Sequence, residues 1–295
     1  METIGKGELW SYFGGHDDPR PLTNGEVRNN AATPVRNYLD LARKVATLQY
    51  LNRNFVLVFR GQASDHKNRN HNTSLQPSLM RPLANPKGGV LPPTTAEFEK
   101  RFQRLRQAEA GLLEAFNARK LMGRELLTRQ RILRWTILQH YEICATPLLD
   151  VSHSLRIAAS FASLKGGDEA FLFVLGLPNL SGAITASAEA GLQIVRLASV
   201  CPPQAVRPHI QEGYLLGEYP GLDGVEQAAL FRNYEVDFGR RLVAKFRFNP
   251  TTFWDGSPGF PRVPKEALYP DSADDPLCAI AEEIGRALAN PQPAT

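Results

Sequence analysis

Short uninterrupted apolar runs alternate along this chain with longer segments of helical periodicity. The runs at residues 55–59, 170–177 and 192–197 are rich in Val, Leu, Ile and Phe, which predicts strands buried on both faces. Residues 242–248 instead alternate between two sets of side chains, as expected of a fourth strand. The pattern therefore predicts a central sheet that contains at least these four strands.

Apolar residues at helical spacing predict several helices between and around those strands. Thr94 and Glu97 have the spacing of a capping box at the start of one of them. The helices are expected at residues 35–51, 94–122, 124–139, 155–162 and 277–288. Helices and strands in this order predict an α+β fold with a mixed central sheet and a large helical insertion.

The segments that lack periodicity divide the chain into three parts. Residues 1–34 open with aromatic side chains and turn polar, which predicts an N-terminal arm that docks on the main body. We expect the main domain at 35–250, with the helical insertion at about 94–139. Residues 251–295 are expected to form a loop and a helix that pack on that domain, with a disordered C-terminal end.

Composition excludes several classes of protein. In a chain of 295 residues, 43% hydrophobic and 22% charged residues are typical of a globular protein. No apolar run approaches the roughly 20 residues of a membrane helix, so we expect no membrane partner. Cys144, Cys201 and Cys278 are far apart, which predicts neither disulfides nor a metal site and favours a cytoplasmic location. A net charge of +4 permits an anionic ligand without requiring one.

The stretch 139–162 concentrates polar groups at the junction of a strand and a helix. Asp150, Ser152 and Ser154 precede a helical pattern and can bond the backbone donors at its start. Such a junction is a common place for a binding site, but the same residues also make a plain N-cap with a turn. Spacing alone leaves both interpretations open.

Three motifs resemble the FRG domain family. Phe59-Arg60-Gly61 matches the motif that names the family, 75–81 matches Leu-x-Pro-Ser-Leu-x-Arg, and 139–162 matches Gln-His-Tyr…Leu-Leu-Asp…Phe-Ala. Residues 207–213 resemble a further family motif, Arg-x-x-x-Gln-x-Gly. The chain departs from the family pattern at Glu142, Pro147 and Val151, where the family has Gly, Arg and Trp.

The order of the motif residues also resembles the outline of ADP-ribosyltransferases, and this resemblance implies NAD as the substrate. On that analogy Arg60 anchors the NAD phosphates, and Ser152 or Ser154 orients the ribose. Gln211 or Glu212 then stabilises the cation formed as nicotinamide leaves. The expected catalytic residues are Arg60, Ser152, Gln211 and Glu212, and the expected ligand-binding residues are Gln62, Arg81, Gln139, His140, Tyr141, Asp150, Ser154 and Arg207. Convergence of these residues in one cleft competes with a buried polar network that only fixes the fold.

Several alternative functions remain open at this stage. His140 beside Ser152 permits a Ser hydrolase, although no GxSxG elbow is present. The basic loop 66–71 and the arginines of the first inserted helix permit nucleic-acid binding, but acidic residues dilute that charge. The preferred prediction is an NAD- or nucleotide-directed enzyme, and a prokaryotic toxin or defence effector is the biological role that we expect for it. The alternative is a non-catalytic domain that binds a nucleotide, nucleic acid or partner peptide in the same cleft.

Overall fold

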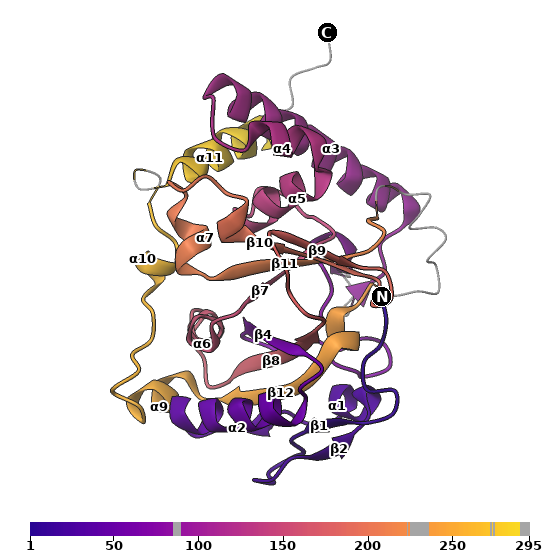
Figure 1. Ribbon diagram of the computed structural model, residues 1–295, viewed down its shortest axis with the longest axis vertical. Coiled ribbons are helices and arrows are strands. Elements are labelled where there is room, and N and C mark those ends of the chain that lie inside the picture. The colour runs from indigo at the N-terminus through magenta and orange to yellow at the C-terminus, as the bar shows by residue number, and fades with distance from the viewer. Residues whose placement is uncertain (85–89, 223, 225–235, 272, 274, 290–295) are drawn as a thin grey trace. The chain divides into compact units, whose positions relative to one another are not determined.

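A computed structural model describes residues 1–84, 90–222, 224, 236–271, 273 and 275–289 (Figure 1). The chain folds into two compact units that are interleaved along the sequence. Unit 1 comprises residues 1–75, 151–181 and 237–268, and unit 2 comprises 76–150, 182–236 and 269–295. Both units contain helices and strands, and the strands pair in parallel and antiparallel fashion, so the predicted α+β class with a mixed sheet is confirmed.

Among the described residues of unit 1, four strands pair side by side and two short strands form a separate pair. Its elements are β1 (Leu9–Ser11), β2 (Arg20–Leu22), α1 (Asn24–Asn29), β3 (Thr33–Pro34), α2 (Tyr38–Leu51), β4 (Val56–Gln62), α6 (Leu155–Ala162), β8 (Ala170–Leu177), η3 (Phe238–Arg241), β12 (Leu242–Phe248), α9 (Pro250–Asp255) and α10 (Lys265–Leu268). Strand β8 pairs antiparallel with β4 on one side and with β12 on the other, and β12 pairs parallel with β3 (Figure 1). The predicted strands at 55–59, 170–177 and 242–248 thus form the centre of this unit.

Helix α6 packs closely on β4 at the glycine of the Phe-Arg-Gly motif. A Cβ atom on Gly61 would lie 1.8 Å from the Ala158 carbonyl oxygen and 2.8 Å from the Ala162 amide nitrogen. Both atoms belong to the helix backbone and cannot move without the whole helix. The glycine therefore permits the approach of helix and strand at this position.

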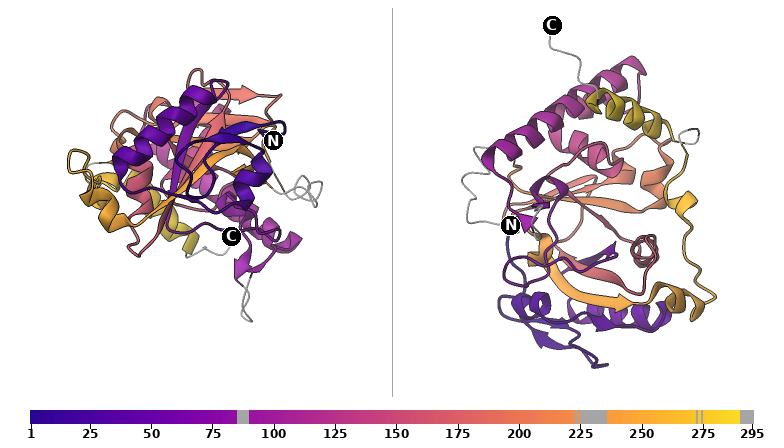
Figure 2. Two further views of the ribbon diagram at one scale, coloured as in Figure 1. Left: turned by 90° about the horizontal axis from the view of Figure 1, so that it is seen from below. Right: turned by 180° about the vertical axis from the view of Figure 1, so that it is seen from behind.

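Unit 2 combines a helical layer with a second group of strands. Its elements are η1 (Ser78–Met80), β5 (Leu83–Ala84), β6 (Val90–Leu91), α3 (Thr95–Ala118), α4 (Arg124–Arg129), α5 (Arg131–His140), β9 (Ile184–Ser187), β10 (Leu192–Arg196), η2 (Leu197–Ser199), α7 (Val206–Ile210), β11 (Gly213–Glu218) and α11 (Pro276–Ala289). Strand β10 pairs antiparallel with β9 and β11. Helices α3 and α11 lie side by side (Figure 2), and α3 buries Phe102, Leu105, Leu112 and Phe116. Strand β7 (Leu149–Ser152) crosses from unit 2 to unit 1 along the sequence.

The structure corrects several predicted boundaries. Strand β4 continues through Arg60 to Gln62, so Arg60 lies inside the strand and not at its end. The single helix predicted at 124–139 is interrupted at Gln130, which has extended backbone angles. Thr94 accepts a hydrogen bond from the Glu97 amide, but the Glu97 carboxylate pairs with Arg101, so the predicted capping box is only half formed.

The ends of the chain follow the prediction in part. Helix α11 forms where the C-terminal helix was expected, and α9 forms within a segment predicted as a loop. The predicted disordered end at 290–295 lies outside the described residues. Within the part of the chain that the structure describes, no helix has both the length and the apolar character to cross a membrane.

Candidate functional site

A polar network in unit 2 is centred on the side-chain amide of Gln139, in the last turn of α5. The Gln139 Oε1 atom accepts hydrogen bonds from Ser78 Oγ at 2.9 Å and from Thr146 Oγ1 at 2.6 Å. Its Nε2 atom donates to Asp150 Oδ2 at 2.8 Å. Because both ends of the amide are engaged, its orientation is fixed and its donor is aimed at the carboxylate.

His140 lies against the other oxygen of the same carboxylate. Its Nδ1 atom is 3.6 Å from Asp150 Oδ1, and the imidazole is buried with 3% exposure, whereas the Asp150 side chain is 33% exposed. Burial lowers the pKa of His140, and the hydrogen-bonding influence of Asp150 opposes that shift. The imidazole is therefore neutral at pH 7, so Asp150 is flanked by two uncharged groups on its buried side and open to solvent on the other.

Arg81 contributes a positive charge near this carboxylate. Desolvation lowers the pKa of Arg81, and the charge of Asp150 opposes the shift. The Arg81 Nε atom donates to the Gln76 carbonyl oxygen at 3.4 Å. Asp150 thus lies within electrostatic range of a guanidinium from the Leu-x-Pro-Ser-Leu-x-Arg motif.

A second cluster of unit 2 surrounds Arg207, in the first turn of α7. The guanidinium lies 5.3 Å from the ring centre of Tyr141 and 4.6 Å from that of Tyr269. One of its terminal nitrogens donates to Glu142 Oε1 at 3.1 Å. The backbone amide of Arg207 and the Tyr141 hydroxyl both donate to Asp275 Oδ2, at 3.0 and 2.7 Å. These contacts fix α7 against the end of α5 and the C-terminal segment.

Both tyrosines of this cluster are held in the protonated form. Burial raises the pKa of Tyr141, and its hydrogen bond to Asp275 raises it further. Burial and the neighbouring Glu142 carboxylate raise the pKa of Tyr269 to about 12. The two hydroxyls therefore act as hydrogen-bond donors at any physiological pH.

The turn after α7 lies beside His140. A Cβ atom on Gly213 would lie 2.5 Å from Leu197 Cδ1, so the glycine leaves space for that side chain, whereas His140 Cε1 would lie at an ordinary contact distance of 3.5 Å. Gln211 is buried with 6% exposure, whereas Glu212 is exposed and has a left-handed backbone with φ of 45°. The role of either residue in stabilising positive charge stays a prediction. The two differ in that the Gln211 amide is buried and the Glu212 carboxylate is exposed to solvent.

In unit 1, the strand register separates the side chains of Arg60 and Ser152. Ser152 pairs with Phe59, and directly paired residues of an antiparallel ladder point to the same face of the sheet. Arg60 is the next residue along β4, so its side chain points to the opposite face, where it shares a row with its partner Phe173. Arg60 and Ser152 therefore lie on neighbouring strands, but their side chains point to opposite faces of the sheet and do not converge on one ligand atom.

The two serines of this junction make local hydrogen bonds. Ser152 Oγ accepts from the Ser154 amide at 3.0 Å, and Ser154 Oγ accepts from the Ile157 amide as the N-cap of α6. These contacts agree with the interpretation of the segment as an N-cap with a turn. Gln62 ends β4, and no hydrogen-bond partner of its buried Oε1 atom lies among the described residues.

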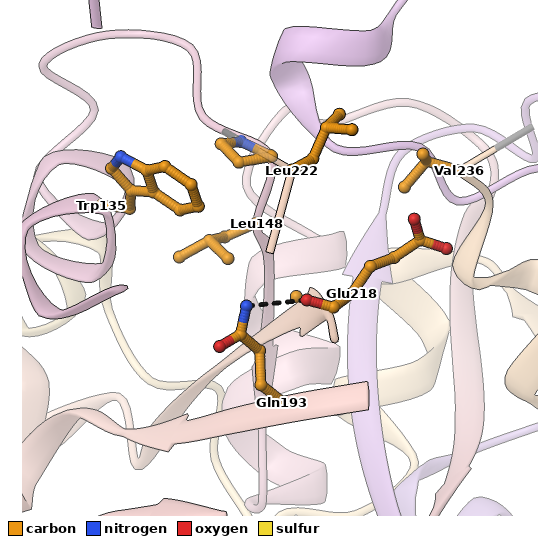
Figure 3. A pocket seen from close by; sticks show the side chains of 8 residues that line it. Trp135, Leu148, Gln193, Glu218, Leu222 and Val236 are labelled. Carbon is orange, nitrogen blue, oxygen red and sulfur yellow. Dashed lines mark hydrogen bonds between the residues drawn. The ribbon is translucent and has the colours of Figure 1, made fainter. Parts of the chain in front are cut away.

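A separate small pocket of unit 2 lies beside Leu148, between α5 and the strands β10 and β11 (Figure 3). It holds about 230 Å³ of empty space, part of it open to solvent. Gln193 Nε2 crosses its wall and donates to the Glu218 carbonyl oxygen at 2.7 Å. The enclosed part has room for little more than one water molecule, and none of the predicted site residues lines it.

The structure brings together a large part of the predicted binding set. Within unit 2, Gln139, His140 and Asp150 form one cluster, and Tyr141 and Arg207 form the adjoining one. Sequence reasoning missed Ser78, Thr146, Glu142, Tyr269 and Asp275 as parts of these clusters. Ser78 belongs to the Leu-x-Pro-Ser-Leu-x-Arg motif, so the sequence could have identified it as a site residue. Tyr269 and Asp275 lie in the C-terminal segment, outside every motif, so no sequence pattern pointed to them.

Comparison with known proteins finds one family, and its match covers several of the motifs described above. A search of curated proteins and a search of solved structures each returned no match. Residues 56–169 match the family described as the FRG domain, and this range holds the Phe-Arg-Gly strand, the Gln139 network and the whole of α6. The match confirms the resemblance to the FRG domain over residues 56–169.

Proposed function

We propose that this FRG-domain protein binds NAD or a related nucleotide and cleaves its N-glycosidic bond. The observation that carries the proposal is the Asp150 carboxylate, which Gln139 Nε2 holds at 2.8 Å while a third of the side chain stays exposed. Loss of nicotinamide leaves an oxocarbenium-like ribose, and a fixed carboxylate stabilises such a cation. The arrangement fits this chemistry because the carboxylate need not reorganise as the charge develops.

The neighbouring groups of unit 2 fit the other needs of the reaction. His140 is neutral and buried, so it adds no positive charge that would cancel the carboxylate. Arg81, within electrostatic range of Asp150, supplies a guanidinium for the phosphates. Gln211 and Glu212 remain proposed charge-stabilising residues, and the roles of Arg60 and Ser152 remain predictions of the ADP-ribosyltransferase resemblance.

The direct test is nicotinamide release from NAD by the purified full chain. The variant Asp150→Asn keeps the shape and size of the side chain but removes its charge. Since one preorganised electrostatic contact is worth on the order of 100-fold or more in rate, we expect a loss of that size. The matched control is Asp255→Asn, which neutralises an exposed aspartate in unit 1 and should leave the rate unchanged.

Arg60→Ala gives a separate arm of the same assay. A loss of NAD binding would support its proposed role as the anchor of the phosphates. Turnover by the wild type that Asp150→Asn does not diminish would rule out the role proposed for Asp150.

A non-catalytic recognition domain is the second candidate function. It is favoured by the hydroxyls of Ser152 and Ser154, which accept hydrogen bonds from the backbone at the start of α6. Saturable NAD binding by the wild type without nicotinamide release would favour this candidate over the enzyme.

A role as a toxin or defence effector would follow from NAD consumption. Expression of the wild type in bacteria would then deplete cellular NAD and arrest growth, and Asp150→Asn would do neither. Growth arrest of equal strength with both chains would disconnect toxicity from the proposed chemistry.

A further inference from the structure

Arg207 is held in a way that differs from an ordinary surface arginine. The residue is 8% exposed, and its guanidinium lies 5.3 Å from the ring centre of Tyr141 and 4.6 Å from that of Tyr269. No hydrogen-bond partner of its buried Nε atom lies in the part of the chain that the structure describes. Its outward nitrogen donates to Glu142 Oε1 at 3.1 Å. The guanidinium is thus oriented in advance, with part of its donor capacity unused.

Glu142, the counterion, is held far less firmly. Its side chain is 65% exposed, and its oxygen contacts are Arg207 at 3.1 Å and the Tyr269 hydroxyl at 3.3 Å. Its backbone has a φ of 58°, a left-handed conformation that favours glycine over a residue with a Cβ atom. A solvent-exposed carboxylate at such a position is easily displaced from its partner.

We propose that Arg207 is an anion-binding residue for a phosphate or diphosphate group and that Glu142 is a resident counterion which this group displaces. A guanidinium binds two phosphate oxygens at once, and it gains more from this than from a single carboxylate oxygen. When the Glu142 side chain swings into solvent, the Tyr269 hydroxyl is released as a second donor to the same anion. No bond is formed or broken, so the step is an exchange of one anion for another.

The other carboxylate of the cluster does not compete for the guanidinium. Asp275 Oδ2 accepts from the Tyr141 hydroxyl and the Arg207 backbone amide, and Asp275 Oδ1 accepts from the Leu277 amide at 3.0 Å. Asp275 is fully buried and fixed by these donors. Glu142 is therefore the group whose charge an incoming anion has to replace.

The inference stands apart from the proposed glycosidic cleavage because its probe contains no glycosidic bond. Binding of inorganic pyrophosphate is measured by titration calorimetry at low ionic strength. The variant Glu142→Gln removes the competing charge, and Glu99→Gln is the matched control, because it makes the same change in net charge at an exposed position in α3. We expect Glu142→Gln to bind pyrophosphate about two- to fivefold more tightly than Glu99→Gln, which is the range that an exposed ion pair supplies.

A second variant identifies the guanidinium as the binding group. Arg207→Lys keeps the positive charge but loses the planar fork, so in the Glu142→Gln background it should remove the gain. Thermal unfolding confirms that each variant is folded at the temperature of the titration. The proposal is overturned if Glu142→Gln binds no more tightly than Glu99→Gln, if Arg207→Lys keeps the gain, or if none of the folded proteins binds pyrophosphate.

Discussion

At the scale of single residues, the Gln139 amide connects three segments of unit 2. It joins Ser78 and Thr146, both of which donate to its oxygen, to the carboxylate of Asp150. A half-buried amide with both of its ends engaged is costly to remove, because its partners lose hydrogen bonds that water replaces only in part. The residue thus has a structural role as well as the proposed role of orienting Asp150.

This predicts a clear loss of stability when the amide is deleted. Gln139→Leu keeps much of the side-chain volume but leaves two hydroxyls and a carboxylate oxygen without their partner, so we expect a loss of about 1–3 kcal/mol. Urea unfolding measures the loss. Gln103→Leu, at an exposed position in α3, is the control and should change stability little. Equal stability of the two variants would contradict the assigned network.

A second prediction concerns Lys245, in β12 of unit 1. Its ammonium donates to Thr73 Oγ1 at 2.7 Å and to the Arg28 carbonyl oxygen at 3.0 Å, and it pairs with Asp65 at 3.3 Å. Burial lowers its pKa from an ordinary 10.5 to about 8, against the opposing effect of Asp65. The folded protein therefore releases this proton at a lower pH than the unfolded chain does.

Stability should consequently rise with pH through this group. Between pH 8 and about 10.5 the unfolded chain binds more protons at Lys245 than the folded one, so its contribution to the free energy of unfolding increases across that window. Lys245→Met should remove this increase, whereas the exposed Lys100→Met should keep it. The measurement is urea unfolding at several pH values from 7 to 10. Parallel profiles for Lys245→Met and the wild type would show that the pKa is not depressed.

At the scale of elements, the Phe-Arg-Gly motif is a strand that a helix closely approaches. Gly61 admits the backbone of α6, while Arg60 points to the other face of β4 and shares a row with Phe173. Phe59 pairs with Ser152 on the helix-covered face. Phe59 and Gly61 thus lie on the face that packs against the helix, and the binding role of Arg60 stays a prediction.

Adding one methyl group to this glycine should be costly. Gly61→Ala places a Cβ atom 1.8 Å from the Ala158 oxygen, so α6 has to shift from β4. Overpacking of this kind costs about 1–3 kcal/mol, and displacement of a backbone puts the substitution at the upper end. Gly259→Ala is the control, because a Cβ atom there meets nothing within 4 Å. Similar melting temperatures for the two variants would refute the close approach.

Elements were predicted correctly where the apolar pattern was continuous. They were missed or misplaced where glycines or the local backbone conformation determined the structure. The segments that became β4, β8 and β10 are continuous apolar runs, and the segment that became β12 alternates regularly, so these four strands were predicted correctly. Strand β11 was missed because Gly213 and Gly217 interrupt its apolar pattern, and a Cβ atom on Gly217 would lie 2.7 Å from Leu148. The interruption at Gln130 was missed because the apolar periodicity continues across it.

At the scale of the whole molecule, the predicted site residues are distributed over both compact units. Arg60, Gln62, Ser152 and Ser154 belong to unit 1, and the other eight belong to unit 2. The motifs predict which residues form the site, but strand register and the C-terminal segment decide what each of them contacts. Neither the opposite faces of Arg60 and Ser152 nor the contact between Tyr269 and Glu142 has a signature in the local sequence, because both arise from pairing across long separations.

The most direct test of the central claim is the rate of nicotinamide release from NAD by the purified wild-type chain and by Asp150→Asn. The proposed chemistry predicts release by the wild type and a loss on the order of 100-fold in the variant. It would be contradicted by a wild-type chain that binds NAD without releasing nicotinamide, or by equal rates in the two proteins.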